Sequence, residues 1–166
     1  MPTRADFVAQ ARKYLGMEHR HQGRGRLGGK DQAVDCVGLL VCAAEDLGLA
    51  DALGMPIRRA DDLNYGPQPV RDDVHSECKR RMITRAEAPK IAILPQPGDI
   101  VTLLVRYRET EPGVTCHVAI VTGLPGSGSL AILHAYAPLG SVVEHELAPK
   151  WIKRIQGIFS IPSLAE

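Results

Sequence analysis

The chain has 166 residues, 45% of them hydrophobic, which suits one globular domain over residues 1–166 with its own core. Twenty Lys and Arg residues balance 19 Asp and Glu residues, so the net charge of +1 gives no general reason to expect nucleic acid or an anionic membrane as a partner. No apolar run has the length of a signal peptide or a membrane span, so we expect synthesis in the cytoplasm without a signal peptide and without membrane insertion.

The N-terminal half has helical patterning. A capping signature and an apolar face predict a first helix that begins at Thr3 and ends at Gly16. After a polar, glycine-rich segment, apolar residues recur at helical spacing from Cys36 until Gly48, which predicts a second helix. The charged stretch RDDVHSECKRRMI, residues 71–83, is a candidate third helix.

From Pro97 onward the pattern changes to short β-branched or alternating runs separated by Gly, Pro and Ser. Five strands are predicted: IVTLLV (100–105), HVAIVT (117–122), LAILHAY (130–136), VVEHEL (142–147) and IQGIFSI (155–161). Helices followed by strands predict an α+β fold, with N-terminal helices packed on a C-terminal antiparallel β-sheet.

Cys36 follows Asp35, the expected N-cap of the second helix. The helix dipole and free backbone N–H groups at such a position stabilise a thiolate and lower its pKa. The basic residues of segment 20–30 favour the anion as well, whereas Asp35 opposes it. Free cysteine is also among the most buried residue types, so position alone does not separate a nucleophile from a packed thiol.

The basic segment 20–30 either binds an acidic ligand or is solvated, and we favour solvation.

Two histidines supply a candidate base and its orienting partner. His117 and His134 lie on successive predicted strands, and a symmetric hairpin centred between Pro125 and Gly126 would place them opposite each other. One imidazole could then take the proton of Cys36 while the second holds the first in the correct tautomer. A lone strand histidine usually has no such role, but two in register beside a helix-capping cysteine favour one.

The remaining histidines are not candidates for the base or its orienting partner. His75 lies in the charged candidate helix, and His145 faces outward by strand alternation. His19 and His21 lie two apart in a loop, where local hydrogen bonding is more common than metal binding.

Other motifs do not predict a cofactor or a metal. GRGRLG, residues 23–28, has the letters of a dinucleotide fingerprint but follows a helix rather than a strand, and GGKD, residues 28–31, lacks parts of a phosphate loop. The four cysteines have no metal-ligand spacing and are expected to be mostly reduced thiols.

The order of motifs resembles the NlpC/P60 cysteine peptidases. The resemblance is carried by DCVGL at a helix start, PGD before a strand, then HVAIVTG and ILHAY. HRHQG upstream and the tail VVEHELAPKWIKRIQGIFSIP resemble especially the members encoded with phage-tail and gene-transfer-agent genes.

This resemblance implies a papain-like fold and a Cys-His-His triad, with Cys36 as nucleophile, His117 as general base and His134 as the orienting residue. It implies a thiol hydrolase without cofactor or metal that cuts a peptidoglycan stem peptide, usually between γ-D-glutamate and a diamino acid. Two residues depart from the family pattern. Val37 replaces a serine that helps hold the free amine of the stem peptide, and His19 replaces a tyrosine.

We expect Asp35, His19 and Val37 to contact substrate, with Asp35 placed to meet an amine. Tail proteins of a phage-like particle are expected partners, and delivery by such a tail would bring the protein to the periplasm and cell wall. Two alternatives stay open. One is a tail assembly or structural protein with little activity, and the other is an amidase or acyltransferase on the same fold.

Overall fold

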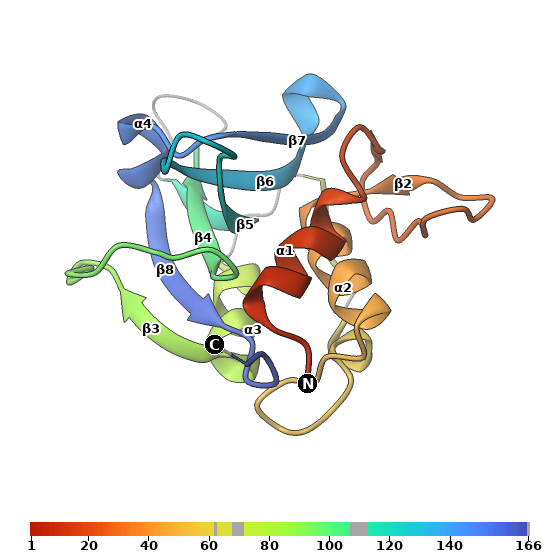
Figure 1. Cartoon of the computed structure of the whole chain (residues 1–166), viewed down its shortest axis with the longest axis horizontal. Coiled ribbons are helices and arrows are strands. Elements are labelled where there is room, and N and C mark those ends of the chain that lie inside the picture. Colours follow the sequence, from red (N-terminus) through yellow and green to blue (C-terminus); the bar gives the residue numbers. More distant parts are fainter. Residues whose placement is uncertain (62, 68–71, 107–112, 166) are drawn as a thin grey trace.

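The computed structural model describes residues 1–61, 63–67, 72–106 and 113–165. Its helices are α1 (Arg4–Arg12), α2 (Cys36–Asp46), α3 (Asp73–Arg81) and α4 (Pro149–Ile152), with 3-10 turns at Ile57–Ala60 and Ala137–Leu139. Its strands are β1 (Glu18–His19), β2 (Ala33–Val34), β3 (Ile83–Glu87), β4 (Ile100–Val105), β5 (Val114–Gly123), β6 (Leu130–Tyr136), β7 (Ser141–Glu146) and β8 (Ile155–Ser160). They form one sheet in the order β2-β1-β7-β6-β5-β4-β8-β3 (Figure 1).

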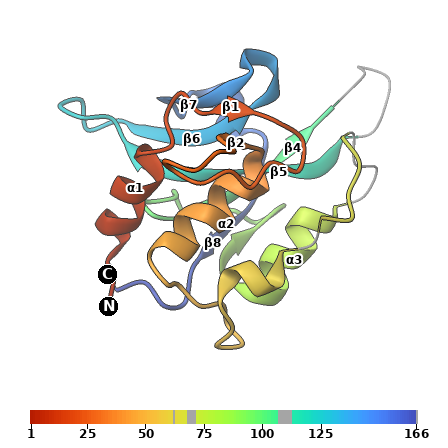
Figure 2. The ribbon, with the colours of Figure 1, turned by 90° about the vertical axis from the view of Figure 1, so that its right-hand side faces the viewer.

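Helices α1, α2 and α3 lie side by side across one face of the sheet (Figure 2). The main core fills this layer, because alternate strand residues such as Ile120 and Leu133 meet Phe7 of α1 and Leu39 of α2. Burial of these apolar surfaces holds α2 against β5 and β6.

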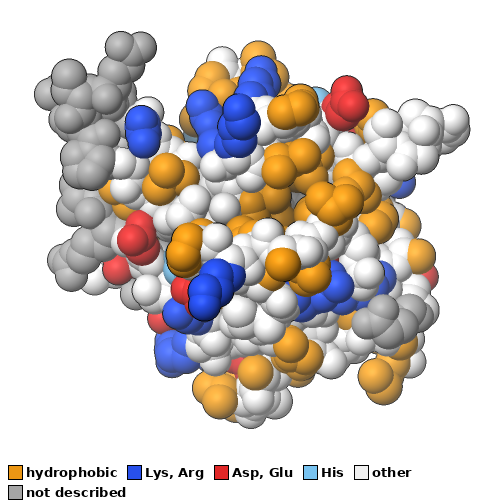
Figure 3. Space-filling model, turned by 90° about the vertical axis from the view of Figure 1, so that its left-hand side faces the viewer, with side chains coloured by type: hydrophobic (Ala, Val, Ile, Leu, Met, Phe, Trp, Pro, Cys, Tyr) orange, Lys and Arg blue, Asp and Glu red, His pale blue; other side chains and the backbone are white. Residues whose placement is uncertain are grey.

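The opposite face of the sheet carries a second, smaller core. Intervening strand residues such as Val121, Ile132 and Ile158 pack there with Trp151 of α4. An apolar hollow of about 330 Å³ lies between segment 88–95 and α4, and hydrophobic side chains and clustered Lys and Arg side chains are visible on this side of the molecule (Figure 3).

The start of α2 is fixed by two local features. The Asp35 side chain caps the helix, accepting a hydrogen bond from the N–H of Gly38 at 2.7 Å. Gly38 is required by close approach, since a β-carbon there would lie 2.0 Å from the carbonyl oxygen of Gly23. Segment 20–25 therefore packs directly against the first turn of α2.

The predicted α+β architecture is confirmed, with helices on a largely antiparallel sheet. The candidate third helix forms as α3, and all five predicted strands are present. The first helix is shorter than predicted, since α1 ends at Arg12 and turns lead to Gly16. The sequence analysis missed α4, β3 and the parallel pair β1–β2, which are short or stabilised by partners distant in sequence. His19 therefore lies in a strand rather than a loop.

The β5–β6 hairpin has a different register from the predicted one. Its ladder begins at the pair Ile120–Leu133, and residues 124–129 form the turn. This turn is centred one residue later than expected, so the register moves by two positions and His117 is not directly opposite His134.

Among the described residues no helix is long and apolar enough to cross a membrane.

Candidate active site

Cys36 occupies the first position of α2 and is half-buried against β5. The backbone N–H groups of Val37 and Val118 point at its sulfur. Val118 directly follows His117, so the helix start and the histidine-bearing strand meet at this thiol.

The end of the β5–β6 ladder explains why a β5 donor faces the thiol. The N–H of Val121 bonds to Asp99 on the β4 side, and N–H directions alternate along a strand. The N–H of Val118 therefore points toward β6. The ladder begins only at Ile120, so this donor lies beyond the last paired residue and is available to the sulfur.

The thiol is not activated in the way that the sequence indicated. Burial, and secondarily the carboxylate of Asp35, raise the pKa of Cys36 to about 12, although the N–H groups of Val37 and Val118 oppose this rise. The expectation of a lowered pKa is wrong, because burial of the thiolate and the nearby Asp35 carboxylate raise it.

The basic segment 20–30 contributes little field at the thiol because its arginines are paired within the chain. Arg20 binds Asp31, Arg26 binds Glu45, and Arg24 binds both Asp35 and Asp61. All five N–H groups of the Arg24 guanidinium have partners, the last two being the Gly23 carbonyl and the Tyr65 hydroxyl. Arg24 is thus a buried structural residue rather than a solvated one.

The carboxylate of Asp35 is equally occupied. It accepts hydrogen bonds from the backbone of Gln22 and Gly38, from the Arg24 guanidinium and from the Tyr65 hydroxyl. The N-cap position expected for Asp35 is confirmed. A substrate amine would have to displace one of these donors to reach the carboxylate, so the observed contacts of Asp35 are structural ones.

His117 and His134 are brought together despite the shifted register. Nε2 of His117 lies 2.7 Å from Nδ1 of His134, and the ring centroids are 5.0 Å apart. Burial lowers the pKa of His117 to about 4 and that of His134 to about 2, so both rings are neutral at pH 7. A neutral imidazole can accept a proton from a neutral thiol.

His134 contacts a third histidine that the sequence analysis had set aside. Nε2 of His134 lies 2.9 Å from Nε2 of His145 on β7, so His145 does not simply face outward. His134 itself is fully buried, stacked on Tyr136 and edge-on to Trp151. The signal for His145 was present in strand alternation, but the face could be assigned only once the β6–β7 register was known.

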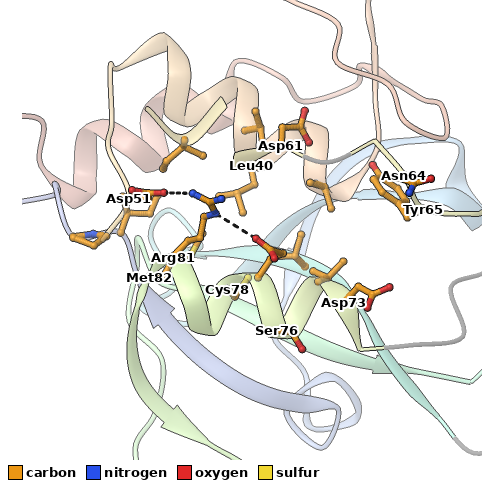
Figure 4. Close-up of a pocket in the computed structure, with 18 residues that line it drawn as sticks. Leu40, Asp51, Asp61, Asn64, Tyr65, Asp73, Ser76, Cys78, Arg81 and Met82 are labelled. Carbon is orange, nitrogen blue, oxygen red and sulfur yellow. Dashed lines mark hydrogen bonds and ion pairs between the residues drawn. The ribbon is translucent and has the colours of Figure 1, made fainter. Parts of the chain in front are cut away.

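The two further predicted substrate-contact residues, His19 and Val37, lie near the start of α2 and His117. His19 on β1 pairs with Val34, two residues before Cys36, and lies close enough to His117 to lower the pKa of that ring electrostatically. Val37 lines a cavity of about 400 Å³ between α2 and α3 (Figure 4). Val118 lines the same cavity, which therefore opens beside the helix start.

The walls of this cavity combine apolar and charged side chains. Figure 4 shows Arg81 of α3 reaching toward Asp51, to which it is bonded at 2.7 Å, and Arg81 also pairs with Glu77. Cys78 and Tyr65 contribute to the lining. Within the described residues, no group of three or more His, Cys, Asp or Glu side chains is arranged to hold a metal ion.

The raised thiol pKa gives a direct pH prediction. In the free protein, the rate of Cys36 carboxamidomethylation by iodoacetamide is expected to rise about tenfold per pH unit between about pH 7 and 9, because only the thiolate reacts. Mass spectrometry of labelled peptides across a pH series measures this rate, and urea-unfolded protein is the control. A plateau below pH 8 would show instead that the thiolate is stabilised.

Neither protein-family models nor curated protein sequences match this chain. Solved structures do. An NlpC/P60 family protein from Bacillus cereus ATCC 10987 overlaps with a TM-score of 0.57 at 16% identity, covering 96% of this chain and 40% of that one. The P60 domain of an antigen from M. avium subspecies paratuberculosis overlaps with a TM-score of 0.52 at 14% identity, covering 95% and 93%. An N-acetylmuramoyl-L-alanine amidase from Bacteroides uniformis ATCC 8492 overlaps with a TM-score of 0.48 at 14% identity, covering 94% and 96%.

The chain thus spans 40% of the length of the Bacillus cereus protein and nearly the whole of the P60 domain. At these identities the likeness concerns the fold. The overall fold of this chain is therefore that of the NlpC/P60 proteins.

Proposed function

We propose that this chain is a cell-wall hydrolase of the NlpC/P60 type, a cysteine peptidase that cuts an amide bond of a peptidoglycan stem peptide between γ-D-glutamate and a diamino acid. The observation that carries the proposal is the 2.7 Å contact between His117 and His134, on a strand that meets the thiol of Cys36 at the next residue. The NlpC/P60 fold supports it.

In the proposed reaction, Nδ1 of His117 accepts the thiol proton as the sulfur of Cys36 attacks the amide carbonyl carbon. The C–N bond then breaks, and the leaving amine takes the proton from His117. Water attacks the resulting thioester and gives a proton to His117. The C–S bond then breaks, the acid product leaves, and His117 returns that proton to the sulfur, which restores the thiol and the neutral base. Each step conserves protons and electrons.

The pKa directions support proton transfer during attack rather than a preformed ion pair. With the pKa of Cys36 raised to about 12 and that of His117 lowered to about 4, both groups are neutral in the free protein. The developing oxyanion gains stabilisation from the N-terminus of α2, where the backbone N–H of Cys36 lies.

The cavity between α2 and α3 suits one side of a stem peptide. Its lining residues Val37 and Val118 are next to the nucleophile and to the base along the chain, so a substrate residue in the cavity lies beside the scissile bond. Val37 and His19 are the proposed substrate contacts. Asp35 caps α2 and thereby positions Cys36.

A place in a phage-like tail, with delivery to the periplasm and cell wall, is part of the proposal and rests on sequence resemblance. The alternatives are a tail structural protein with little activity and an amidase or acyltransferase on the same fold. The proposed nucleophile, base and orienting residue are all present, which disfavours the purely structural role.

Product analysis separates these functions. Purified peptidoglycan is incubated with the protein, and the released fragments are identified by mass spectrometry. We expect fragments with a new amino terminus on the diamino acid, and heat-inactivated protein is the control. Release of intact stem peptides from the sugar would identify an amidase, and an unchanged fragment profile would contradict hydrolase activity.

A further inference from the structure

Three histidines form a continuous hydrogen-bonded row across β5, β6 and β7. His117 Nε2 is 2.7 Å from His134 Nδ1, and His134 Nε2 is 2.9 Å from His145 Nε2. The row ends where Nδ1 of His145 lies 2.9 Å from the backbone carbonyl oxygen of Glu146. His134 and His145 each use both of their ring nitrogens.

When His145 is neutral, the carbonyl end of the row determines the direction of every hydrogen bond in it. A carbonyl oxygen only accepts, so Nδ1 of His145 donates and, in a neutral ring, its Nε2 accepts. His134 must then donate from Nε2 to His145 and accept at Nδ1. His117 in turn donates from Nε2 to His134, which leaves the lone pair of its Nδ1 free.

We infer that His145 is a positioning residue: through His134, it selects the His117 tautomer whose Nδ1 accepts the Cys36 proton. The inference rests on the proposed function and adds a fourth residue to its site. The same bond directions hold when His117 becomes imidazolium during the reaction, because Nε2–H still donates to His134. The row therefore supports both protonation states of the base.

Without an acceptor at position 145, the direction of the row is no longer determined. His134 could then donate from Nδ1 to His117, and His117 would carry its proton on Nδ1, where the base needs a lone pair. In the native direction, the buried Nε2–H of His134 would lack a partner, which costs free energy. Both effects reduce the population of the competent tautomer.

Two substitutions at position 145 separate bonding from packing. The His145 ring packs on Trp151, with centroids 5.1 Å apart, and His145→Phe keeps an aromatic ring there without a nitrogen. His145→Gln keeps an acceptor, since its amide N–H can donate to the Glu146 carbonyl while its oxygen accepts from His134. The exposed Lys150 on α4 supplies a control, Lys150→Gln.

In assays of stem-peptide hydrolysis, we expect His145→Phe to lower kcat on the order of tenfold or more with KM unchanged, a loss similar to that seen when the hydrogen-bond partner of a metal-binding histidine is removed. His145→Gln is expected to retain most of kcat, and Lys150→Gln all of it. An unchanged kcat in His145→Phe, or an equal loss in His145→Gln, would overturn the inference.

NMR of ¹⁵N-labelled histidine rings tests the row without relying on catalysis. We expect His117 and His134 of the wild-type protein to carry their protons on Nε2, and His145→Phe to populate the Nδ1–H forms. A wild-type His134 protonated on Nδ1 contradicts the inference. If the wild-type protein cuts no stem peptide, the proposed function fails while this measurement still decides the direction of the row.

Discussion

Replacing Cys36 with alanine is expected to lower kcat for stem-peptide hydrolysis by roughly a millionfold, as loss of the nucleophile does in a serine protease that forms an acyl-enzyme. The reason is that no covalent thioester can form without the sulfur. Mass spectrometry of peptidoglycan fragments measures the loss, and isothermal titration with a non-cleaved stem peptide tests whether binding is retained.

Cys42 offers a matched control on the same helix. It lies on α2 and is fully buried in the main core, so Cys42→Ala makes the same chemical change outside the proposed site. We expect this variant to be somewhat less stable, because a buried sulfur is lost, yet active. Equal fragment profiles from wild type, Cys36→Ala and Cys42→Ala would refute the assignment of the nucleophile.

Replacing His117 with alanine is expected to lower kcat by roughly a hundred- to ten-thousandfold, the usual contribution of a positioned base. The effect should be large because the pKa of the Cys36 thiol is raised to about 12, so few thiolates exist at pH 7 to attack unaided. Part of the lost rate should return as pH is raised, since hydroxide then replaces the base. A series of rates from pH 7 to 10 measures both effects.

Substitutions of two other histidines serve as a control and a comparison for His117→Ala. His75 is similarly enclosed, bonded to Thr102 and Glu87, so His75→Ala removes a comparable imidazole outside the site. We expect it to change stability more than kcat. His134→Ala should lower kcat less than His117→Ala, because an orienting residue contributes less than the base it holds. A His134→Ala protein as active as wild type would show that the pair is wrongly assigned.

Local patterns were sufficient for much of the fold. The strands at 100–105 and 130–136 and the start of α2 at Cys36 have the predicted bounds, because hydrophobic periodicity and helix caps act within a few residues. Strand β3 was missed apart from Ile83, which the sequence places at the end of the third helix, since its place in the sheet depends on pairing with β8 at the far end of the chain.

The candidate site was also predicted from the sequence only in part. Cys36, His117 and His134 stood out by residue type and order, and the structure places His117 against His134 and the Cys36 thiol beside the next residue of β5. The hairpin register was wrong by two positions, because the centre of a glycine-rich turn could not be located from the sequence. The two rings meet as diagonal neighbours, within the reach of imidazole side chains.

The amino-acid sequence by itself determined the order of the elements, the cap that places Cys36 at a helix start, and the two histidines that follow on neighbouring strands. Only the tertiary structure decided the protonation state of the thiol, the pairing of Arg24 and the place of His145 in the histidine row. The physical reason is the distance along the chain over which each interaction acts. Caps and periodicity are local, whereas desolvation, ion pairing and the face of a strand depend on what lies across the fold.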